Sequence, residues 1–350
     1  MTMGKIEEMI GLGADFWSDS CDLRELSAAV ERGAVGATSN PVIVSTVVAE
    51  DPDTWDPHLH RIEREQPGLS DEALAWRWID AIAVEASRLL LPVFERTRGA
   101  KGILNVQVNP EHARAPEKMI DQARHLASLA PNLAVKIPLT REGLVAIEAL
   151  SAEGIRTNAT VSFSVSQAIA AAEAMERGMR RRSRGDSAFT PYVTIMVGRV
   201  ADHLKRVQEA EMLLADPGAA DWAGIAIFKR AYARFRERGL RPVLVAAAYR
   251  HRRQWSELIG DGLVQSIPYK WWCAFDASDV PLTNTIDHPV SPSILSELSR
   301  YFPDFVRAYE DDGMRPDEFD RYGASVATLR QFEAGYRELV ARVSRLRGRS

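Results

Sequence analysis

Short apolar runs alternate with longer helical patterns along most of the chain. Residues 133–137 form one such run, a helical pattern follows with Leu144 and Leu150 among its apolar positions, and residues 157–163 then alternate polar and apolar side chains. Side chains of a strand point alternately to its two faces, whereas helical neighbours recur every three or four residues. This stretch therefore predicts strand, helix and strand, which is one α/β repeat plus the next strand.

The same patterns predict six further strands. They fall at residues 14–20, 34–40, 101–109, 192–198, 242–248 and 263–267. Most of them are followed by a helical pattern, and strands separated by helices form a parallel sheet. Eight such repeats predict an α/β protein built as a single (β/α)8 TIM barrel.

Two regions do not fit the simple repeat. Residues 51–70 are rich in Pro, Asp, Glu and His and predict an irregular excursion, whereas residues 71–98 predict a long helix outside the main body. The C-terminal region is mainly helical with broken patterns. Residues 1–350 are therefore predicted to form one barrel domain, with a helical insertion at 51–98 after the second strand and a helical C-terminal extension at 276–350.

Polar side chains cluster near the C-terminal ends of the predicted strands. On the strand at 101–109, Asn105 and Gln107 share a face, and on the strand at 157–163, Asn158 and Thr160 do so. The wider set is Asp19, Asn40, Gln107, Lys136, Asn158, Thr160, Thr194, Arg199 and Arg250. Active sites of barrels lie at this end, so the coincidence predicts a functional site there.

Lys136 interrupts an apolar strand and shares a face with Ala134. Burial disfavours a charged amine, so the pKa of such a lysine falls and the amine becomes a nucleophile. Alternatively, the lysine is structural, with its stem on apolar surface and its head in water. The polar stripe on the next strand favours the nucleophile, because buried polar groups need partners that a barrel mouth supplies.

Composition narrows the class of protein. Of the 350 residues, 46% are hydrophobic and 26% charged, which is typical of a soluble globular protein, and the net charge of −4 argues against a general nucleic-acid binder. No apolar run approaches the roughly 20 residues that span a bilayer, and the N-terminus lacks a signal-peptide pattern. We expect neither nucleic acid nor a membrane as a partner.

Cysteine and histidine usage adds two further expectations. Cys21 and Cys273 are too few for a disulfide framework, so a cytoplasmic location is expected. The seven histidines are scattered, and no metal-ligand spacing occurs. The basic run at 177–186 contains no interleaved aromatic residues, so it predicts a solvated loop rather than an RNA site.

Seven segments together resemble the transaldolase family of class I, Schiff-base aldolases. They are SDSCD at 18–22, GATSNP at 36–41, NVQV at 105–108, AVKIPLTREGLVAIEALSAEGI at 134–155, NATVSFS at 158–164, VGR at 197–199 and AAYR at 247–250. The resemblance implies an enzyme of carbohydrate metabolism, as in the pentose phosphate pathway. Such an enzyme transfers a three-carbon dihydroxyacetone unit from a ketose donor to an aldose acceptor, both sugar phosphates, through a lysine Schiff base. It implies no metal or organic cofactor, and it leaves open whether the chain forms a homo-oligomer.

The resemblance also implies catalytic roles for four residues. Lys136 corresponds to the amine that attacks the ketose carbonyl, and Asp19 to the acid/base that moves protons. Thr160 corresponds to the hydroxyl that positions a catalytic water. Gln107 stands where transaldolases proper usually carry a glutamate that works with the aspartate through that water, and here it resembles the fructose-6-phosphate aldolase branch.

The implied substrate-binding residues come from four strand ends. Asn40 and Asn158 correspond to side chains that hold substrate hydroxyls, and Thr194 stands where the family often has serine. Arg199 and Arg250 correspond to a phosphate clamp, a role that suits the guanidinium fork.

Three departures from the family pattern, at Gln107, Met196 and Ala248, leave alternatives open. Met196 stands where transaldolases have phenylalanine and the aldolase branch has tyrosine, and Ala248 replaces a serine of the phosphate pocket. With Gln107 unable to take a proton, one alternative is a fructose-6-phosphate-aldolase-like lyase that releases free dihydroxyacetone. The other is a barrel that binds a sugar phosphate without turnover.

Overall fold

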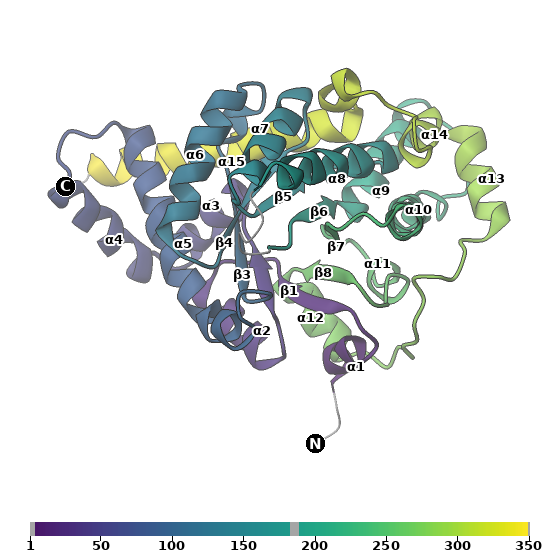
Figure 1. Cartoon of the computed structure of the whole chain (residues 1–350), viewed down its shortest axis with the longest axis horizontal. Coiled ribbons are helices and arrows are strands. Elements are labelled where there is room, and N and C mark those ends of the chain that lie inside the picture. Colours follow the sequence, from purple (N-terminus) through teal and green to yellow (C-terminus); the bar gives the residue numbers. More distant parts are fainter. Residues whose placement is uncertain (1–3, 183–188, 349–350) are drawn as a thin grey trace.

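Eight parallel strands form a closed barrel in the computed structural model, which describes residues 4–182 and 189–348 (Figure 1). The strands are β1 (Asp15–Ser18), β2 (Gly36–Thr38), β3 (Ile103–Gln107), β4 (Leu133–Pro138), β5 (Thr157–Thr160), β6 (Tyr192–Ile195), β7 (Val243–Ala246) and β8 (Leu263–Ile267). Each strand pairs with its neighbours in sequence, and β8 closes the barrel on β1, where Ile267 lies opposite Ser18. The predicted (β/α)8 barrel and its eight strands are therefore confirmed.

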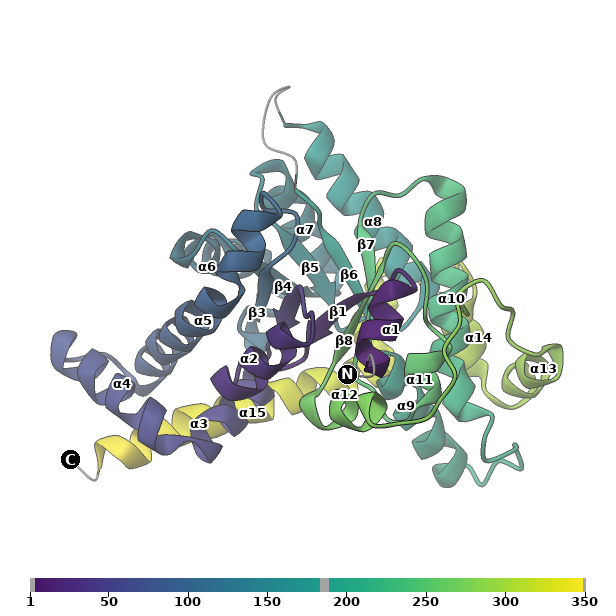
Figure 2. The same cartoon turned by 90° about the horizontal axis from the view of Figure 1, so that it is seen from below.

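Helices cover the outside of this barrel (Figure 2). Those of the basic repeat are α1 (Lys5–Gly11), α2 (Leu23–Glu31), α3 (Pro41–Glu50), η1 (Pro110–His112), α6 (Pro116–Leu129), α7 (Arg141–Ala152), α8 (Val165–Arg180), α9 (Val197–Ala210), α10 (Ala220–Arg238) and α11 (Arg253–Ser256). Local sequence explains where several begin, because Asp22, Asn40 and Thr140 each accept hydrogen bonds from first-turn backbone N–H groups. Most predicted strands are longer than the observed ones, since their last residues leave the sheet as loops or helix caps.

The insertion after β2 is more regular than the sequence indicates. Residues 52–65 form a helix, α4 (Pro52–Glu65), so the predicted irregular excursion is wrong there. Trp55, Leu59 and Ile62 are buried at helical spacing, and this burial outweighs the internal Pro57 and the polar composition. The predicted long helix is α5 (Asp71–Arg96), and it packs on β3 and α4.

The C-terminal extension is helical as predicted. Helix α12 (Tyr269–Asp276) follows β8, and the extension comprises α13 (Pro292–Tyr301), α14 (Pro303–Tyr309), η2 (Pro316–Arg321) and α15 (Gly323–Arg347). Helix α15 lies along α3 (Figure 2) and also contacts α5 and α9. A side chain at Gly335 would come within 2.7 Å of Val42 Cγ2, so the absence of a Cβ allows α15 to approach α3 closely. This helix therefore reaches the end of the barrel where α3 and α9 begin.

Apolar side chains fill the interior of the barrel near the strand starts. Trp17, Tyr192, Val245 and Val264 form a buried cluster there, and the rings of Trp17 and Tyr192 meet edge to face at 4.6 Å. Gly36 accommodates this cluster, because a Cβ would lie 2.5 Å from Trp17 Nε1. The polar side chains of the barrel interior consequently lie toward the opposite end, near the C-terminal ends of the strands.

Three further observations concern surfaces and sites. Arg177 and Arg180 of the basic run lie in the last turn of α8, and residues 183–186 of that run lie outside the described residues. Within residues 4–182 and 189–348, no helix is long and apolar enough to cross a membrane. The same residues contain no group of three His, Cys, Asp or Glu side chains arranged to hold a metal ion.

Candidate active site

Strand β4 places Lys136 inside the barrel at its C-terminal half. The strand register puts Gln107 of β3 on one side of Lys136 and Asn158 of β5 on the other. The lysine is only 4% exposed, and its Nζ donates a hydrogen bond of 3.1 Å to the carbonyl oxygen of Ser39. Three predicted site residues therefore lie side by side on adjacent strands.

Burial changes the chemistry of the Lys136 amine. It lowers the pKa of Lys136 from 10.5 to about 8, the carboxylate of Asp19 opposes the shift, and the guanidinium of Arg199 adds to it. The free amine is consequently present in a useful fraction near neutral pH, as a nucleophile requires.

Asp19 follows β1 and faces the same space. Its Oδ1 accepts a hydrogen bond of 2.6 Å from Thr38 Oγ1, which in turn lies 2.6 Å from Ser266 Oγ. Burial raises the pKa of Asp19 above its usual value, while Lys136 and then the Thr38 hydrogen bond oppose the rise. Thr38 and Ser266 were not predicted as site residues, although Thr38 lies within the GATSNP segment.

A chain of hydrogen bonds fixes the amide of Asn158. Thr194 Oγ1 donates to Asn158 Oδ1 at 2.8 Å, Asn158 Nδ2 donates to Asn105 Oδ1 at 3.0 Å, and Asn105 Nδ2 donates to Ala37 O at 2.9 Å. All three side chains are buried. These hydrogen bonds link residues of four strands, so they determine which edge of the Asn158 amide faces the site.

Gln107 and Thr160 stand out because their buried polar atoms have no partner within the described structure. Both Oε1 and Nε2 of Gln107 and Oγ1 of Thr160 are unpaired. Buried polar groups are normally hydrogen-bonded, and such exceptions mark positions for water or a ligand. In the strand register Gln107 lies opposite Lys136, and Thr160 lies opposite Pro138, two residues further along β4.

Asn40 and Met196 both begin helices at the end of the barrel that carries Lys136. The Oδ1 of Asn40 accepts the N–H groups of Val42 and Ile43, which leaves its Nδ2 for other partners. Met196 is buried and is the N-cap of α9, where its side chain makes no capping hydrogen bond. Strand β6 ends at Ile195, and Gly198 lies in the first turn of α9.

Two arginines lie beyond the lysine. Arg199 is in the first turn of α9, and burial followed by repulsion from Arg250 lowers its pKa to about 10. Arg250 follows β7, and its guanidinium donates to Asp202 Oδ2 at 2.9 Å and to the carbonyl oxygens of Ala248 and Tyr249. The proximity of two cations to each other favours an anion as the missing partner.

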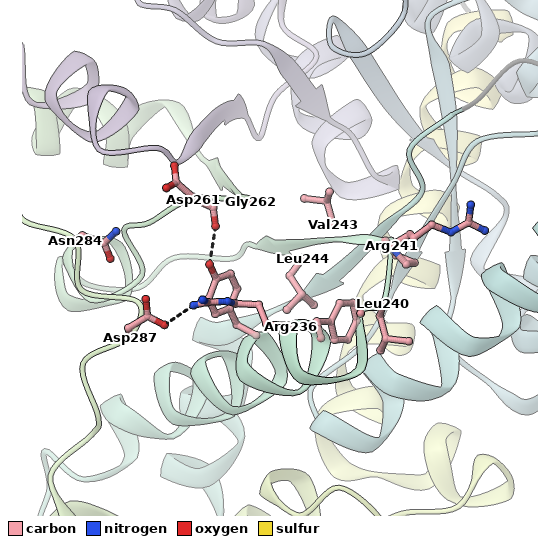
Figure 3. A pocket seen from close by; sticks show the side chains of 13 residues that line it. Arg236, Leu240, Arg241, Val243, Leu244, Asp261, Gly262, Asn284 and Asp287 are labelled. Atoms are coloured by element: carbon pink, nitrogen blue, oxygen red, sulfur yellow. Dashed lines mark hydrogen bonds and ion pairs between the residues drawn. The ribbon is translucent and has the colours of Figure 1, made fainter.

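A cavity of about 580 Å³ lies at the other end of the barrel, next to the starts of β7 and β8 (Figure 3). One of its charged groups, Arg236, is paired with Asp287 at 2.9 Å, and the Tyr232 hydroxyl donates to the carbonyl oxygen of Asp261. None of the predicted site residues lines it. The cavity is therefore separate from the Lys136 site.

Comparison with known proteins identifies the family. A family model described as Transaldolase/Fructose-6-phosphate aldolase matches residues 16–320. A transaldolase of Thiobacillus denitrificans (strain ATCC 25259 / T1) is 29% identical, with 97% of this chain and 100% of the relative aligned. A transaldolase of Thermobifida fusca (strain YX) is 35% identical over 56% of this chain and 55% of its own length. The chain belongs to the transaldolase/fructose-6-phosphate aldolase family and is an enzyme of the aldolase or transferase type.

Proposed function

We propose that the protein transfers a three-carbon dihydroxyacetone unit from a ketose phosphate to an aldose phosphate through a Schiff base on Lys136. The observation that carries the proposal is the buried Lys136 amine, whose pKa falls to about 8 and which shares the site with Asp19. The unpaired atoms of Gln107 and Thr160 beside it provide places for a water molecule. No metal or organic cofactor is required for this chemistry.

The reaction begins when the free amine of Lys136 attacks the C2 carbonyl of the ketose. The carbinolamine loses water to form an iminium, and Asp19 moves the protons between its oxygen and solvent. The C3–C4 bond then breaks, with its electron pair drawn toward the iminium nitrogen, while Asp19 takes the proton of the C4 hydroxyl. The enamine left on Lys136 adds to the carbonyl carbon of an aldose, and hydrolysis releases the new ketose.

Substrate binding falls to the residues around the lysine. Asn158, held by Thr194, and the free Nδ2 of Asn40 hold the substrate hydroxyls. Arg199 and Arg250 hold the phosphate, which would relieve the repulsion between the two guanidinium groups. The side chain of Met196 forms an apolar wall near the first turn of α9.

A second function is favoured by one specific residue. Glutamine at position 107 orients water but does not ionise, so it cannot share protons with Asp19 as a glutamate would. If water protonates the enamine before an aldose arrives, the enzyme is a lyase that releases free dihydroxyacetone. Both functions use the same Lys136 intermediate.

We also propose a cytoplasmic location. Cys21 and Cys273 are both free thiols, as expected in a reducing compartment such as the cytoplasm.

Borohydride trapping tests the Schiff base. Incubation with fructose 6-phosphate and borohydride should attach a three-carbon unit to Lys136, located by peptide mass mapping. Lys136→Arg should abolish the adduct, and Lys101→Arg, a matched change at a lysine paired with Asp15, should not. An adduct on another lysine, together with an active Lys136→Ala variant, would contradict the proposal. Product analysis with and without erythrose 4-phosphate then separates transfer from cleavage.

A further inference from the structure

The C-terminal helix α15 contributes two side chains to the arginine pair. Arg199 Nη1 donates a hydrogen bond to Gln331 Oε1, and the Arg199 guanidinium lies over the Phe332 ring, 5.4 Å from its centroid. Gln331 lies 132 residues after Arg199 in the sequence, at the surface end of the site, whereas Phe332 is fully buried. Helix α15 therefore forms one wall of the arginine site.

The charge of this site is incompletely balanced. Arg250 is paired with Asp202, but the hydrogen-bond partner of Arg199 on α15 is a neutral amide. Arg199 Nε is buried and has no hydrogen-bond partner within the described structure. Because this guanidinium has a buried N–H without a partner and only a neutral acceptor beside it, it is arranged to bind an anion.

The position of α15 relative to Arg199 is fixed by packing. The helix begins at Gly323, where a Cβ would meet His203 Cε1 at 2.2 Å, and His203 lies one turn after Arg199 on α9. The His203 Nε2 is 2.7 Å from Asp304 Oδ2. These contacts, together with buried Phe332, hold the backbone of Gln331 while leaving its exposed amide free to turn.

We propose that Gln331 is a specificity-determining residue for phosphorylated substrates, an inference that rests on the proposed function. Without ligand, its Oε1 accepts a hydrogen bond from Arg199 Nη1. When the substrate phosphate binds Arg199, the amide turns and its Nε2 donates to a phosphate oxygen. An amide suits this exchange because one rotatable group carries both an acceptor and a donor.

Two substitutions at Gln331 separate these roles. Gln331→Glu places a carboxylate that pairs with Arg199 and repels the phosphate dianion, so the kcat/KM ratio for fructose 6-phosphate over unphosphorylated fructose should fall roughly tenfold or more. Gln331→Ala removes both the acceptor and the donor but adds no charge, and the ratio should fall by about threefold to tenfold. Glu338→Gln is the matched control, because Glu338 is exposed further along α15 and the described structure gives its side chain no hydrogen bond or ion pair.

Inorganic phosphate provides a readout that does not need turnover. The thermal midpoint of the full chain should rise with phosphate for the native sequence and for Glu338→Gln, less for Gln331→Ala, and least for Gln331→Glu. Equal phosphate stabilisation and equal substrate ratios in all four proteins would overturn the role of Gln331. Failure of borohydride trapping in the native chain would instead overturn the proposed function, and the phosphate titration would still decide whether Gln331 serves an anion site.

Discussion

At the scale of single residues, the titration of Lys136 links burial to reactivity. Only the free amine attacks a carbonyl, and burial places its pKa at about 8. The initial rate of borohydride trapping should therefore rise between about pH 7 and pH 9, with a midpoint near 8. Measurement of trapped adduct against pH tests this expectation. A midpoint near the ordinary lysine value of 10.5 would mean that the amine is solvated in the working enzyme.

The Thr38 hydroxyl is expected to tune Asp19. Its hydrogen bond stabilises the carboxylate and so lowers the pKa of Asp19 relative to burial alone. Thr38→Val removes this bond, so the acidic limb of the pH–rate profile should move to higher pH. Thr38→Ser retains the hydroxyl and serves as the control. Identical profiles for the two variants would show that the acidic limb does not report Asp19.

Asp19 itself is expected to carry most proton transfers, because Gln107 does not ionise. Asp19→Asn should reduce C–C cleavage by roughly 10²–10⁴-fold, the usual share of general acid–base catalysis. The measurement is the single-turnover release of the aldose. A reduction of less than tenfold would indicate that another group moves the proton.

We propose that Gln107 orients a water molecule in the same site. Since both polar atoms of its amide are unpaired beside Lys136, Gln107→Glu should change the ratio of transfer to cleavage more than it changes trapping at Lys136. Quantifying trapped adduct and both product channels tests this. An unchanged product ratio accompanied by loss of trapping would assign Gln107 to the barrel core instead.

At the scale of elements, the loop after β7 and the first turn of α9 position the two arginines together. A Cβ at Gly198 would lie 1.9 Å from the carbonyl oxygen of Ala248 and 2.7 Å from Arg250 Cγ. Ala248 already has a left-handed φ of 64°, so this loop has little freedom to move. Close contact between the two elements therefore sets the distance between Arg199 and Arg250.

Gly198→Ala should separate these elements. We expect the free energy of unfolding to fall by about 1–3 kcal/mol, as for other overpacked sites, and KM for phosphorylated substrates to rise. Gly11→Ala is the control, because Gly11 ends α1 with no atom within 4 Å of the added Cβ, and its effect should stay within about 1 kcal/mol. Denaturant unfolding and steady-state kinetics measure the two effects. Unaltered KM in a destabilised variant would separate the loop geometry from phosphate binding.

At the scale of the whole molecule, the insertion and the C-terminal extension pack on each other and on the barrel. Helix α15 contacts α3, α5 and α9, and Arg342 of α15 pairs with Asp56 of α4 at 2.9 Å. We propose that residues 1–350 unfold as one domain. Far-ultraviolet circular dichroism and tryptophan fluorescence should give one coincident thermal transition, because tryptophans lie both in the barrel (Trp17) and in the insertion (Trp78). Two separated transitions would divide the chain into independent units.

Local patterns along the chain were enough to predict the order of strands and helices and most of the candidate site. Strand and helix periodicity are local properties, and so are helix caps such as Asp22. They predicted all eight strands and, through the strand ends, the end of the barrel at which Lys136, Gln107 and Asn158 meet. Composition was a weaker guide. The polar composition of residues 51–70 predicted an irregular segment, although Trp55 and Leu59 have helical spacing and lie in α4.

Which distant residues share the site became apparent only from the folded arrangement. Thr38 and Ser266 are 228 residues apart, and Arg199 and Gln331 are 132 residues apart. The first pair meets because β8 closes the barrel on β1 beside β2, and the second because α15 packs back across α3 and α9. Neither closure nor packing leaves a local pattern along the chain, since both depend on burying surfaces that come together only in the folded molecule.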